Sequence, residues 1–275
     1  MGKSISTVRL SNELVRSAQK LKLSEKRFLM MAVSKVTDEN ISGRIAVTAI
    51  EYAEFYGVSK TSAYNTIAEA RDGIFGRFFI LGDQDHQWFK SRTRDTKGYA
   101  EIVFHEAIAP HIHDLKSCYT QYYLRRAGNF KHVYSWRLFE LLMQFRTTGK
   151  LVITLADFKE ILEVPESYNR DFSAVRHKVI NPSIKEIVAS GLPVKLKTIK
   201  KGRAISTLEF TFKLEQQRDW VGKKPEGNPE QQPKRITKKY IEQNARPGES
   251  YSEAQERLQR ELAKQQQEVQ YQKSA

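Results

Sequence analysis

Hydrophobic and polar positions follow the same order twice along the chain. The segment GRIAVTAIEYAEFYGV at 43–58 returns at a constant offset as GKLVITLADFKEILEV at 149–164. In each copy, four residues typical of a β-strand run directly into a segment with helical spacing. Thr48 and Thr154 stand at the two joins, each with an acidic residue three positions later, which predicts an N-cap with a capping box. The repeat therefore predicts two copies of one structural unit.

Amphipathic segments on both sides of each short strand predict further helices. One apolar stripe begins near Ser24 and another near Ser135, upstream of the two strands. A third helix is predicted downstream, at 62–75 and at 171–188. The predicted buried stripes comprise Ile50, Ala53 and Tyr56, then Tyr64, Ile67 and Ala68 in the first copy, and Leu155, Phe158, Ile161 and Leu162, then Phe172, Val175, Val179 and Ile180 in the second.

A two-stranded hairpin is predicted after each third helix. In the second copy, 193–212 alternates around the turn Lys200-Lys201-Gly202-Arg203. In the first copy, strands at 78–83 and 100–105 flank a long polar excursion. Helix, short strand, helix, turn, helix and hairpin is the element order of a winged helix-turn-helix.

The expected fold class is α+β, with two tandem winged helix-turn-helix domains at 1–116 and 117–214. The tail at 215–275 starts with a stretch rich in Pro, Gly, Gln and Lys and ends in one thin apolar stripe. Such a tail is predicted to be flexible and partly helical, its helix either solitary or docked on a partner. A repeated α+β unit without a role in DNA binding is the less favoured alternative on the pattern alone.

Charge favours a DNA-binding role. The chain has 46 Lys and Arg against 32 Asp and Glu, a net charge of +14, which favours a polyanionic partner such as nucleic acid or an anionic membrane. No apolar run approaches the roughly 20 residues that span a bilayer, and the start lacks the apolar core of a signal peptide. The single Cys118 leaves no internal disulfide. We therefore expect a cytoplasmic protein that binds no membrane.

The exposed face of each third helix is expected to enter a major groove while the wing follows the phosphates. Arg and Asn read base edges, and Lys suits phosphates. The candidate DNA contacts of the second domain are Arg170, Ser173, Arg176, His177, Lys178 and Asn181 on the helix and Lys200, Lys201 and Arg203 in the wing. Those of the first domain are Lys60, Thr61, Asn65 and Arg71 on the helix and Lys90, Arg92 and Arg94 in the wing. Glu69 and Asp72 share that first face and would repel phosphate, so the first domain is expected to bind DNA more weakly or to pair with another subunit.

One motif suggests a different class of protein. His111-Ile112-His113, followed by Tyr119, Tyr122 and Tyr123, resembles the metal site and nucleophile of a rolling-circle nickase. Both rings would point the same way only on a strand, whereas the spacing of Ile112, Leu115 and Tyr119 after Pro110 predicts a helix. Two surface histidines are therefore expected. Asp83 and Asp85 are expected to be solvated acids of a turn, and no Gly-rich phosphate loop is present, so neither enzyme activity, metal nor cofactor is predicted.

Longer phrases carry a family resemblance. LSNELVRSAQKLKLSEKRFL, YSWRLFELLMQF, VINPSIKEIVASGLPVKLKTIKKGR and LEFTF occur in this order between 10 and 213. Together they resemble the iteron-binding replication initiators of theta-replicating plasmids. The tail after about 215 has no counterpart in that resemblance.

The resemblance implies two winged-helix domains that bind double-stranded origin DNA. Monomers would bind direct repeats, and a homodimer would repress its own gene at an operator inverted repeat. The host replication initiator, helicase and chaperones would be partners in opening the origin. Base reading would reside on Ser173, Arg176, His177 and Lys178, and much of the dimer surface in the first domain. A winged-helix transcriptional repressor without an initiator role remains the alternative.

Overall fold

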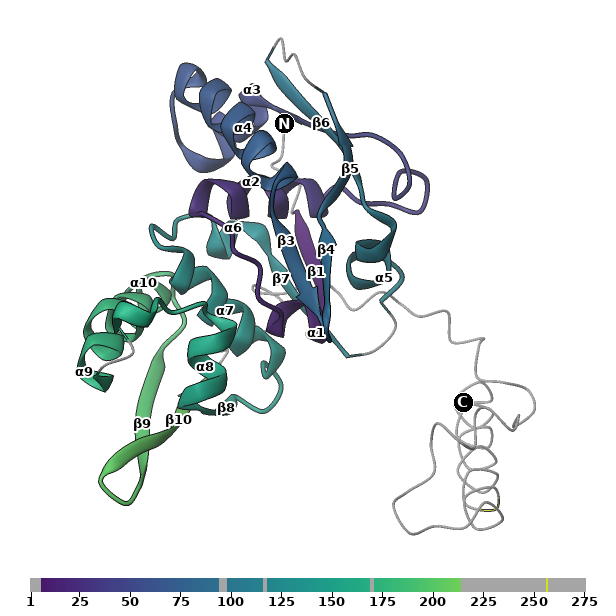
Figure 1. Ribbon diagram of the computed structural model, residues 1–275. Coiled ribbons are helices and arrows are strands. Elements are labelled where there is room, and N and C mark those ends of the chain that lie inside the picture. The colour runs from purple at the N-terminus through teal and green to yellow at the C-terminus, as the bar shows by residue number, and fades with distance from the viewer. Residues whose placement is uncertain (1–5, 94–97, 116–117, 169–170, 214–255, 257–275) are drawn as a thin grey trace, which may run out of the picture. The chain divides into compact units, whose positions relative to one another are not determined.

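The computed structural model describes residues 6–93, 98–115, 118–168, 171–213 and Glu256 (Figure 1). The described residues up to Lys213 all belong to one compact unit, Met1–Lys223. Both predicted winged-helix domains lie in this unit, and we call them the first module (1–116) and the second module (117–214). Apart from Glu256, the predicted tail at 215–275 lies outside the described residues.

The first module contains the predicted helix-turn-helix. Its elements up to the third helix are β1 (Thr7–Ser11), α1 (Asn12–Arg16), α2 (Leu23–Val33), β2 (Ile45–Thr48), α3 (Ala49–Tyr56) and α4 (Lys60–Phe75). The predicted capping box forms, since the Thr48 side chain accepts a hydrogen bond from Glu51 N at 3.2 Å and the Glu51 carboxylate accepts one from Thr48 N at 3.4 Å. Gly57 ends α3 with a φ of 66°, a left-handed conformation that glycine adopts without strain. Ser59 caps α4 by accepting a hydrogen bond from Ser62 N.

The wing of the first module differs from the prediction. The four strands concerned are β3 (Phe78–Leu81), β4 (Gln84–Gln87), β5 (Phe89–Arg92) and β6 (Tyr99–Phe104). β3 pairs with β4 in a hairpin of its own, while β5 pairs with β6 and β6 with β2. Pairing the first predicted strand with the last was wrong, because the turn at Gly82, with a φ of 61°, reverses the chain at once. Asp83 and Asp85 of this hairpin are exposed, as predicted.

A short linking region follows, with η1 (Glu106–Ile108), α5 (Ala109–Ile112), β7 (Tyr119–Tyr123) and α6 (Leu124–Ala127). The predicted helix through Leu115 and Tyr119 was wrong, because α5 ends at Ile112 and Tyr119 begins a strand. Asp114 and Cys118 both have positive φ, which interrupts the helical spacing. β7 pairs antiparallel with β1, so the start of the chain joins a sheet with the beginning of the second module. The boundary at 116 stays a prediction.

The second module repeats the order of the first. Its elements are α7 (Val133–Gln144), β8 (Lys150–Thr154), α8 (Leu155–Ile161), η2 (Glu166–Tyr168), α9 (Phe172–Val175), the π-helical turn η3 (Arg176–Ile180), α10 (Asn181–Ala189), β9 (Val194–Lys201) and β10 (Ala204–Phe212). The sheet order is β8-β10-β9. The Thr154 side chain caps α8 by accepting from Asp157 N at 3.1 Å. The predicted third helix is present as the uninterrupted run of α9, η3 and α10.

The π turn of this third helix has a local cause. Asn181 N donates to the carbonyl oxygen of Arg176, five residues earlier. Pro182 follows directly and has no N–H to continue the ordinary ladder. The widened turn therefore falls on the residues predicted to read DNA.

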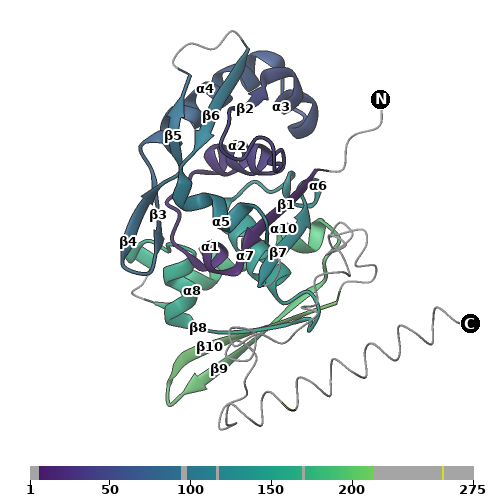
Figure 2. The same cartoon turned by 90° about the vertical axis from the view of Figure 1, so that its right-hand side faces the viewer.

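The core is continuous across both modules. α7 is buried on nearly every side and packs against β7, β8 and α10, and Figures 1 and 2 both show it between the β1–β7 pair and the sheet of the second module. The predicted stripes are confirmed in the second module, although Leu155 and Phe172 are half-buried. No helix in the described part of the chain has both the length and the apolar character needed to cross a membrane.

In the first module the stripes are shifted in phase. Ile50 and Tyr64 were predicted to be buried but are 55% and 42% exposed. Tyr52 and Ala63 are buried instead, followed on α4 by Ile67. One residue of displacement turns a helical side chain by about 100°, and short stripes of mixed character do not fix that phase.

Candidate nucleic-acid interface

The exposed face of the second module's third helix is the first part of a candidate DNA-binding surface. Asp171 caps α9, its carboxylate accepting from Ser173 N at 3.0 Å. Val175 and Val179 are fully buried and fix the rotation of the helix about its axis. The predicted exposure is confirmed for Ser173, Arg176, His177, Lys178 and Asn181. Arg170 lies outside the described residues.

Lys178 has a partner that the sequence did not reveal. Its Nζ lies 4.5 Å from the centre of the Tyr168 ring, a cation–π contact. Tyr168 belongs to η2, in the connection between α8 and α9, and is partly buried against the core. In the sequence, the only indication of this contact was an aromatic residue a few positions before the helix. The contact therefore ties Lys178 to the connection that precedes the third helix.

The wing forms the second part of this surface. β9 and β10 meet at Gly202, whose φ of 66° allows the tight turn. The predicted contacts Lys200, Lys201 and Arg203 flank that glycine and are all exposed. No salt bridge engages any of the three within the part of the chain that the structure describes.

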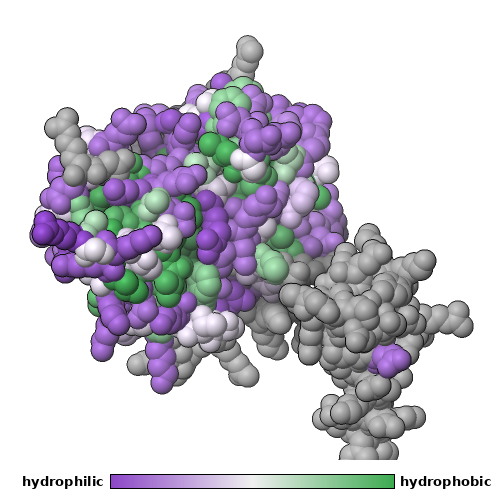
Figure 3. Space-filling model, turned by 60° about the horizontal axis from the view of Figure 1, so that its bottom comes forward, coloured by the Kyte–Doolittle hydropathy of each residue, from purple (hydrophilic) through white to green (hydrophobic). Residues whose placement is uncertain are grey.

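The outward face of the second module's sheet carries further polar residues. Lys195 and Lys197 are exposed on β9, at alternate positions that the sequence analysis did not single out. On the neighbouring strands, Lys150 Nζ lies 2.8 Å from Glu209 Oε2, and the hydrogen bond from Lys150 lowers the pKa of Glu209. Figure 3 turns this lower end of the molecule forward, and hydrophilic residues cover most of the described surface around smaller hydrophobic areas.

On the first module, α4 presents a smaller polar face. The predicted contacts Lys60, Thr61 and Asn65 are all exposed. Tyr64 lies between them on the same side of the helix, a consequence of the shifted phase. The exposed face of α4 therefore adds a tyrosine ring that the sequence analysis had assigned to the core.

Other predicted cations of the first module are engaged within the fold. The Arg71 side chain is only 3% exposed, so its predicted place on the exposed face was wrong. Its Nε and Nη2 donate to the two carboxylate oxygens of Asp72 at 2.8 and 3.0 Å. Arg92 Nη1 also donates to Asp72, and its guanidinium lies over the Phe75 ring at 4.7 Å. With two guanidinium partners, Asp72 is not the free negative charge that was expected to repel phosphate.

Lys90, in the wing of the first module, is also paired with an acidic residue of the same module. It forms an exposed ion pair with Glu106, and the hydrogen bond from Lys90 lowers the pKa of Glu106. Arg94 lies outside the described residues. Neither Lys90 nor Arg92 is thus available to a phosphate without giving up a carboxylate partner.

The two histidines of the alternative nickase motif contact different residues. His111 Nδ1 lies 2.8 Å from Ser11 Oγ, and burial lowers the pKa of His111. His113 Nε2 lies 2.6 Å from Asp38 Oδ1. Both rings are half-buried, so the expectation of surface histidines was wrong. Among the described residues, no three His, Cys, Asp or Glu side chains gather as they would around a metal ion.

Tyr122, a candidate nucleophile of that motif, is fully buried. Its hydroxyl donates to Glu140 Oε1 at 2.8 Å, and burial holds the pKa of Tyr122 well above its ordinary value. A nucleophilic tyrosine must reach the scissile phosphate, so this residue serves the core instead.

Comparison with known proteins identifies two domain families along the chain. Residues 7–143 match the domain family described as "Initiator Replication protein, WH1", and residues 154–212 match "Initiator Rep protein, WH2". The first match runs through α7, which we assign to the second module because of its packing.

Individual relatives are more distant. An Escherichia coli "Replication initiation protein" is 27% identical over 227 residues, which cover 77% of this chain and 71% of the relative. An "Uncharacterized 27.6 kDa protein" of Escherichia coli is 26% identical over 200 residues, covering 66% of this chain and 84% of that protein. The crystal structure of "Pi initiator protein in complex with iteron DNA" superposes with a TM-score of 0.66 at 20% identity, over 81% of this chain and 100% of the other. That likeness shows the fold.

The two domain matches follow one another along the chain in the order of the two winged-helix units, and the resemblance drawn from the sequence is confirmed. With its paired winged-helix domains and curated relative, the chain belongs to the family of initiator replication proteins.

Proposed function

We propose that this protein initiates plasmid replication by binding repeated origin DNA sequences, the iterons, through its second module. The observation that carries the proposal is the combination of five exposed polar residues on the third helix with three exposed wing cations. A helix face of this kind can read base edges, while the cations suit phosphates on either side. The solved initiator of the same fold is described as a complex with iteron DNA, which supports the same kind of ligand here.

The first module adds a second, weaker contact in this proposal. In Figure 1, α4 lies at the top of the unit and α9 at its lower left. Two similar modules on one side of a duplex suit successive major grooves, about 10 bp apart, so one chain would cover about 20 bp. Lys60, Thr61, Tyr64 and Asn65 are the residues that α4 offers for this contact.

The finer part of the proposal rests on the family resemblance. Monomers bind direct repeats, and homodimers bind the operator inverted repeat, because a twofold protein needs a twofold site. The protein acts in the bacterial cytoplasm without catalysis, metal or cofactor. Origin opening is completed by the host initiator, the helicase and chaperones.

A footprint on the origin of the protein's own plasmid tests the proposal. We expect protection of about 20 bp per iteron, on one side of the duplex. Protection limited to one half-turn would remove the two-module part, and the absence of sequence-specific protection would remove the whole. A plasmid that carries only the origin, with the protein supplied separately, tests the repressor alternative. Failure of that plasmid to replicate despite specific binding would favour the repressor.

A further inference from the structure

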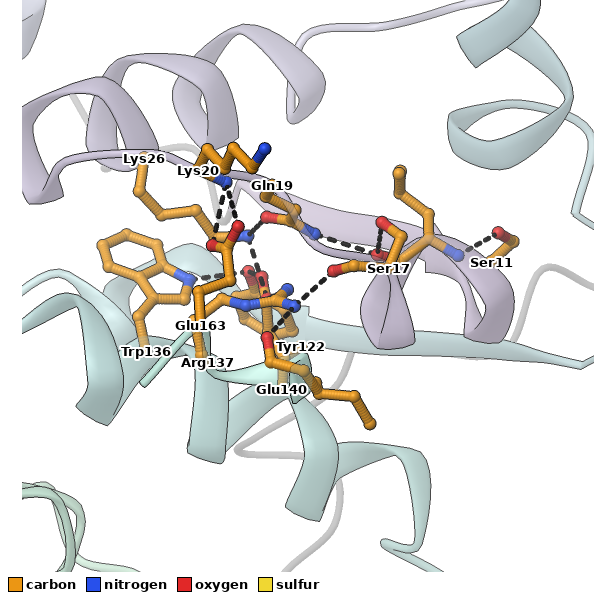
Figure 4. A network of polar contacts seen from close by, with 12 residues as sticks. Ser11, Ser17, Gln19, Lys20, Lys26, Tyr122, Trp136, Arg137, Glu140 and Glu163 are labelled. Atoms are coloured by element: carbon orange, nitrogen blue, oxygen red, sulfur yellow. Dashed lines mark hydrogen bonds and ion pairs between the residues drawn. The ribbon is translucent and has the colours of Figure 1, made fainter. Parts of the chain in front are cut away.

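A buried polar cluster joins the two modules. It consists of Gln19 and Lys26 on one side of the predicted boundary at 116 and Tyr122, Trp136, Arg137 and Glu140 on the other, and we call it the inter-module cluster (Figure 4). All six residues lie within the first family match at 7–143, and the contact of Arg137 with Ile161 carries the link into the second match at 154–212. Lys26 Nζ lies 2.9 Å from Glu140 Oε2, and both side chains are 0% exposed. α2 and α7 carry these two charges, so a fully buried ion pair links the first helix of one winged-helix unit to that of the other.

The pair is held by directional contacts on both sides. Lys26 also donates to Gln19 Oε1 at 2.9 Å. The second oxygen of Glu140 accepts from the Tyr122 hydroxyl at 2.8 Å, and this hydroxyl accepts from Trp136 Nε1 at 3.0 Å. Arg137 Nη1 lies 3.5 Å from Glu140 Oε2. Every charge in the cluster thus has a partner of fixed direction.

The cluster continues to the helix that precedes the candidate DNA-binding face. Arg137 Nη2 donates to the carbonyl oxygens of Ser17, in the first module, and Ile161, at the end of α8, at 2.6 and 3.0 Å. Beside it, both carboxylate oxygens of Glu163 accept from Lys20 N at 2.7 and 2.8 Å. These hydrogen bonds therefore join α8 of the second module to the chain segment around α1. The two winged-helix modules are thus connected through one hydrogen-bonded network.

Such a cluster adds little to the free energy of unfolding, but it fixes the relative positions of the elements that it joins. Desolvation disfavours buried charges, as the pKa of Lys26, lowered by burial to about 8, illustrates. Apolar side chains of similar volume often do as well or better for stability. The two kinds of contact differ in how strictly they fix geometry. An apolar contact tolerates sliding, whereas a shifted buried ion pair leaves an uncompensated charge in the core.

We propose that the inter-module cluster fixes the angle between the two winged-helix modules and thereby sets the separation of the two DNA contacts that one chain accepts. Lys26 and Glu140 are in this sense positioning residues that act on DNA specificity without touching DNA. The inference rests on the proposed two-module binding. It adds that spacing selectivity originates in the core and not at the DNA surface.

The test compares binding to duplexes in which base pairs are inserted or removed between the segments contacted by the two modules. The parent protein should prefer one separation and lose about tenfold in affinity, the worth of one good base contact, when the separation changes by two base pairs. The Lys26→Met/Glu140→Leu double variant should keep most of its affinity for the second module's half-site alone and bind the altered separations nearly equally. Lys35→Met/Glu51→Gln, which removes a partly exposed ion pair of similar length within the first module, is the matched control and should keep the parent's preference.

Two outcomes would overturn the inference. A folded double variant with the parent's sharp preference shows that the cluster does not set the spacing. A parent that binds every separation equally removes the two-module function itself, and the inference with it. If the double variant does not fold, Tyr122→Phe serves instead, because it deletes one hydrogen bond to Glu140 and leaves the ion pair in place. It should broaden the preference measurably, and an unchanged profile in this variant would count against the inference as well.

Discussion

The two winged-helix modules share an element order but use their cations differently. In the second module, Arg176 and Lys201 are exposed without any salt bridge among the described residues. In the first, Arg71 and Arg92 both bind Asp72. A free cation turns to a phosphate at the cost of its own hydration, whereas a paired cation must also lose its carboxylate partner. A count of basic residues on a winged helix therefore overstates the DNA-binding surface wherever acidic residues of the same module pair with them.

The largest expected effect comes from the second module's wing. Replacing Lys200, Lys201 and Arg203 together with Ala should lower the salt slope of DNA binding by about three units and the affinity at 0.1 M salt by about a thousandfold. Cognate and scrambled DNA should lose alike, because phosphates carry no sequence. Titration of both duplexes across a salt series measures this. The Lys90→Ala/Arg92→Ala variant of the first module is the comparison, and an equal loss there would break the contrast between the modules.

Arg176 should give the next largest effect. Its change to Ala should cost about 1 to 3 kcal/mol on cognate DNA and relax discrimination at one base pair, because a bidentate base contact is lost. Binding to a set of singly substituted sites identifies that base pair. Equal losses on cognate and scrambled DNA, with the fold retained, would show that Arg176 holds phosphate, and the reading role would then pass to His177 or Lys178.

A third test concerns the frame that joins the two modules. Burial lowers the pKa of Lys26 to about 8 from its usual 10.5, so between these values the unfolded chain holds a proton that the folded protein lacks. The destabilising contribution of Lys26 is therefore fully present below pH 8 and is relieved as the pH rises towards 10.5. From pH 8 to pH 10, the free energy of unfolding of the parent should rise by about 1 to 2 kcal/mol relative to Lys26→Met. Denaturant unfolding at several pH values measures the difference, and a flat difference would contradict the lowered pKa of Lys26 in the folded protein.

The smallest effect is expected on α4 of the first module. Tyr64→Ala should weaken binding by about 1 kcal/mol, consistent with one apolar contact to a base or a thymine methyl group. Tyr64→Phe keeps the ring and separates this contact from any role of the hydroxyl. Exchange of thymine for deoxyuracil in the first module's segment should reduce the difference between parent and Tyr64→Ala. A loss for Tyr64→Ala as large as that for Arg176→Ala would mean that the first module reads DNA as strongly as the second.

Much of the fold could be predicted because its signals are local. Thr48 and Thr154 mark helix starts through hydrogen bonds that span only three residues. The wing around Gly202 follows from alternation and one turn residue. The exposed face of the third helix in the second module could also be predicted, because the apolar residues Val175 and Val179 indicate which side of that helix is buried.

The incorrect predictions of burial and exposure have a different physical origin. Tyr64 and Arg71 lie on a helix whose apolar residues are small and scattered, so packing against the rest of the module decided which side was buried. Arg71 became acceptable inside only because Asp72 supplies both carboxylate oxygens to its guanidinium.

The amino-acid sequence was sufficient to predict two winged-helix units, their third helices, the second wing and membership of an initiator family. Tertiary structure decided which strands pair, as between β1 and β7, and which charges remain free. It also decided that Lys26 and Glu140, 114 residues apart, meet in a dry core. Local preferences act over a few residues and are written in the order of the chain. Long-range pairing depends on surfaces that exist only after folding, when the loss of water makes an unpaired buried charge such as that of Lys26 unfavourable.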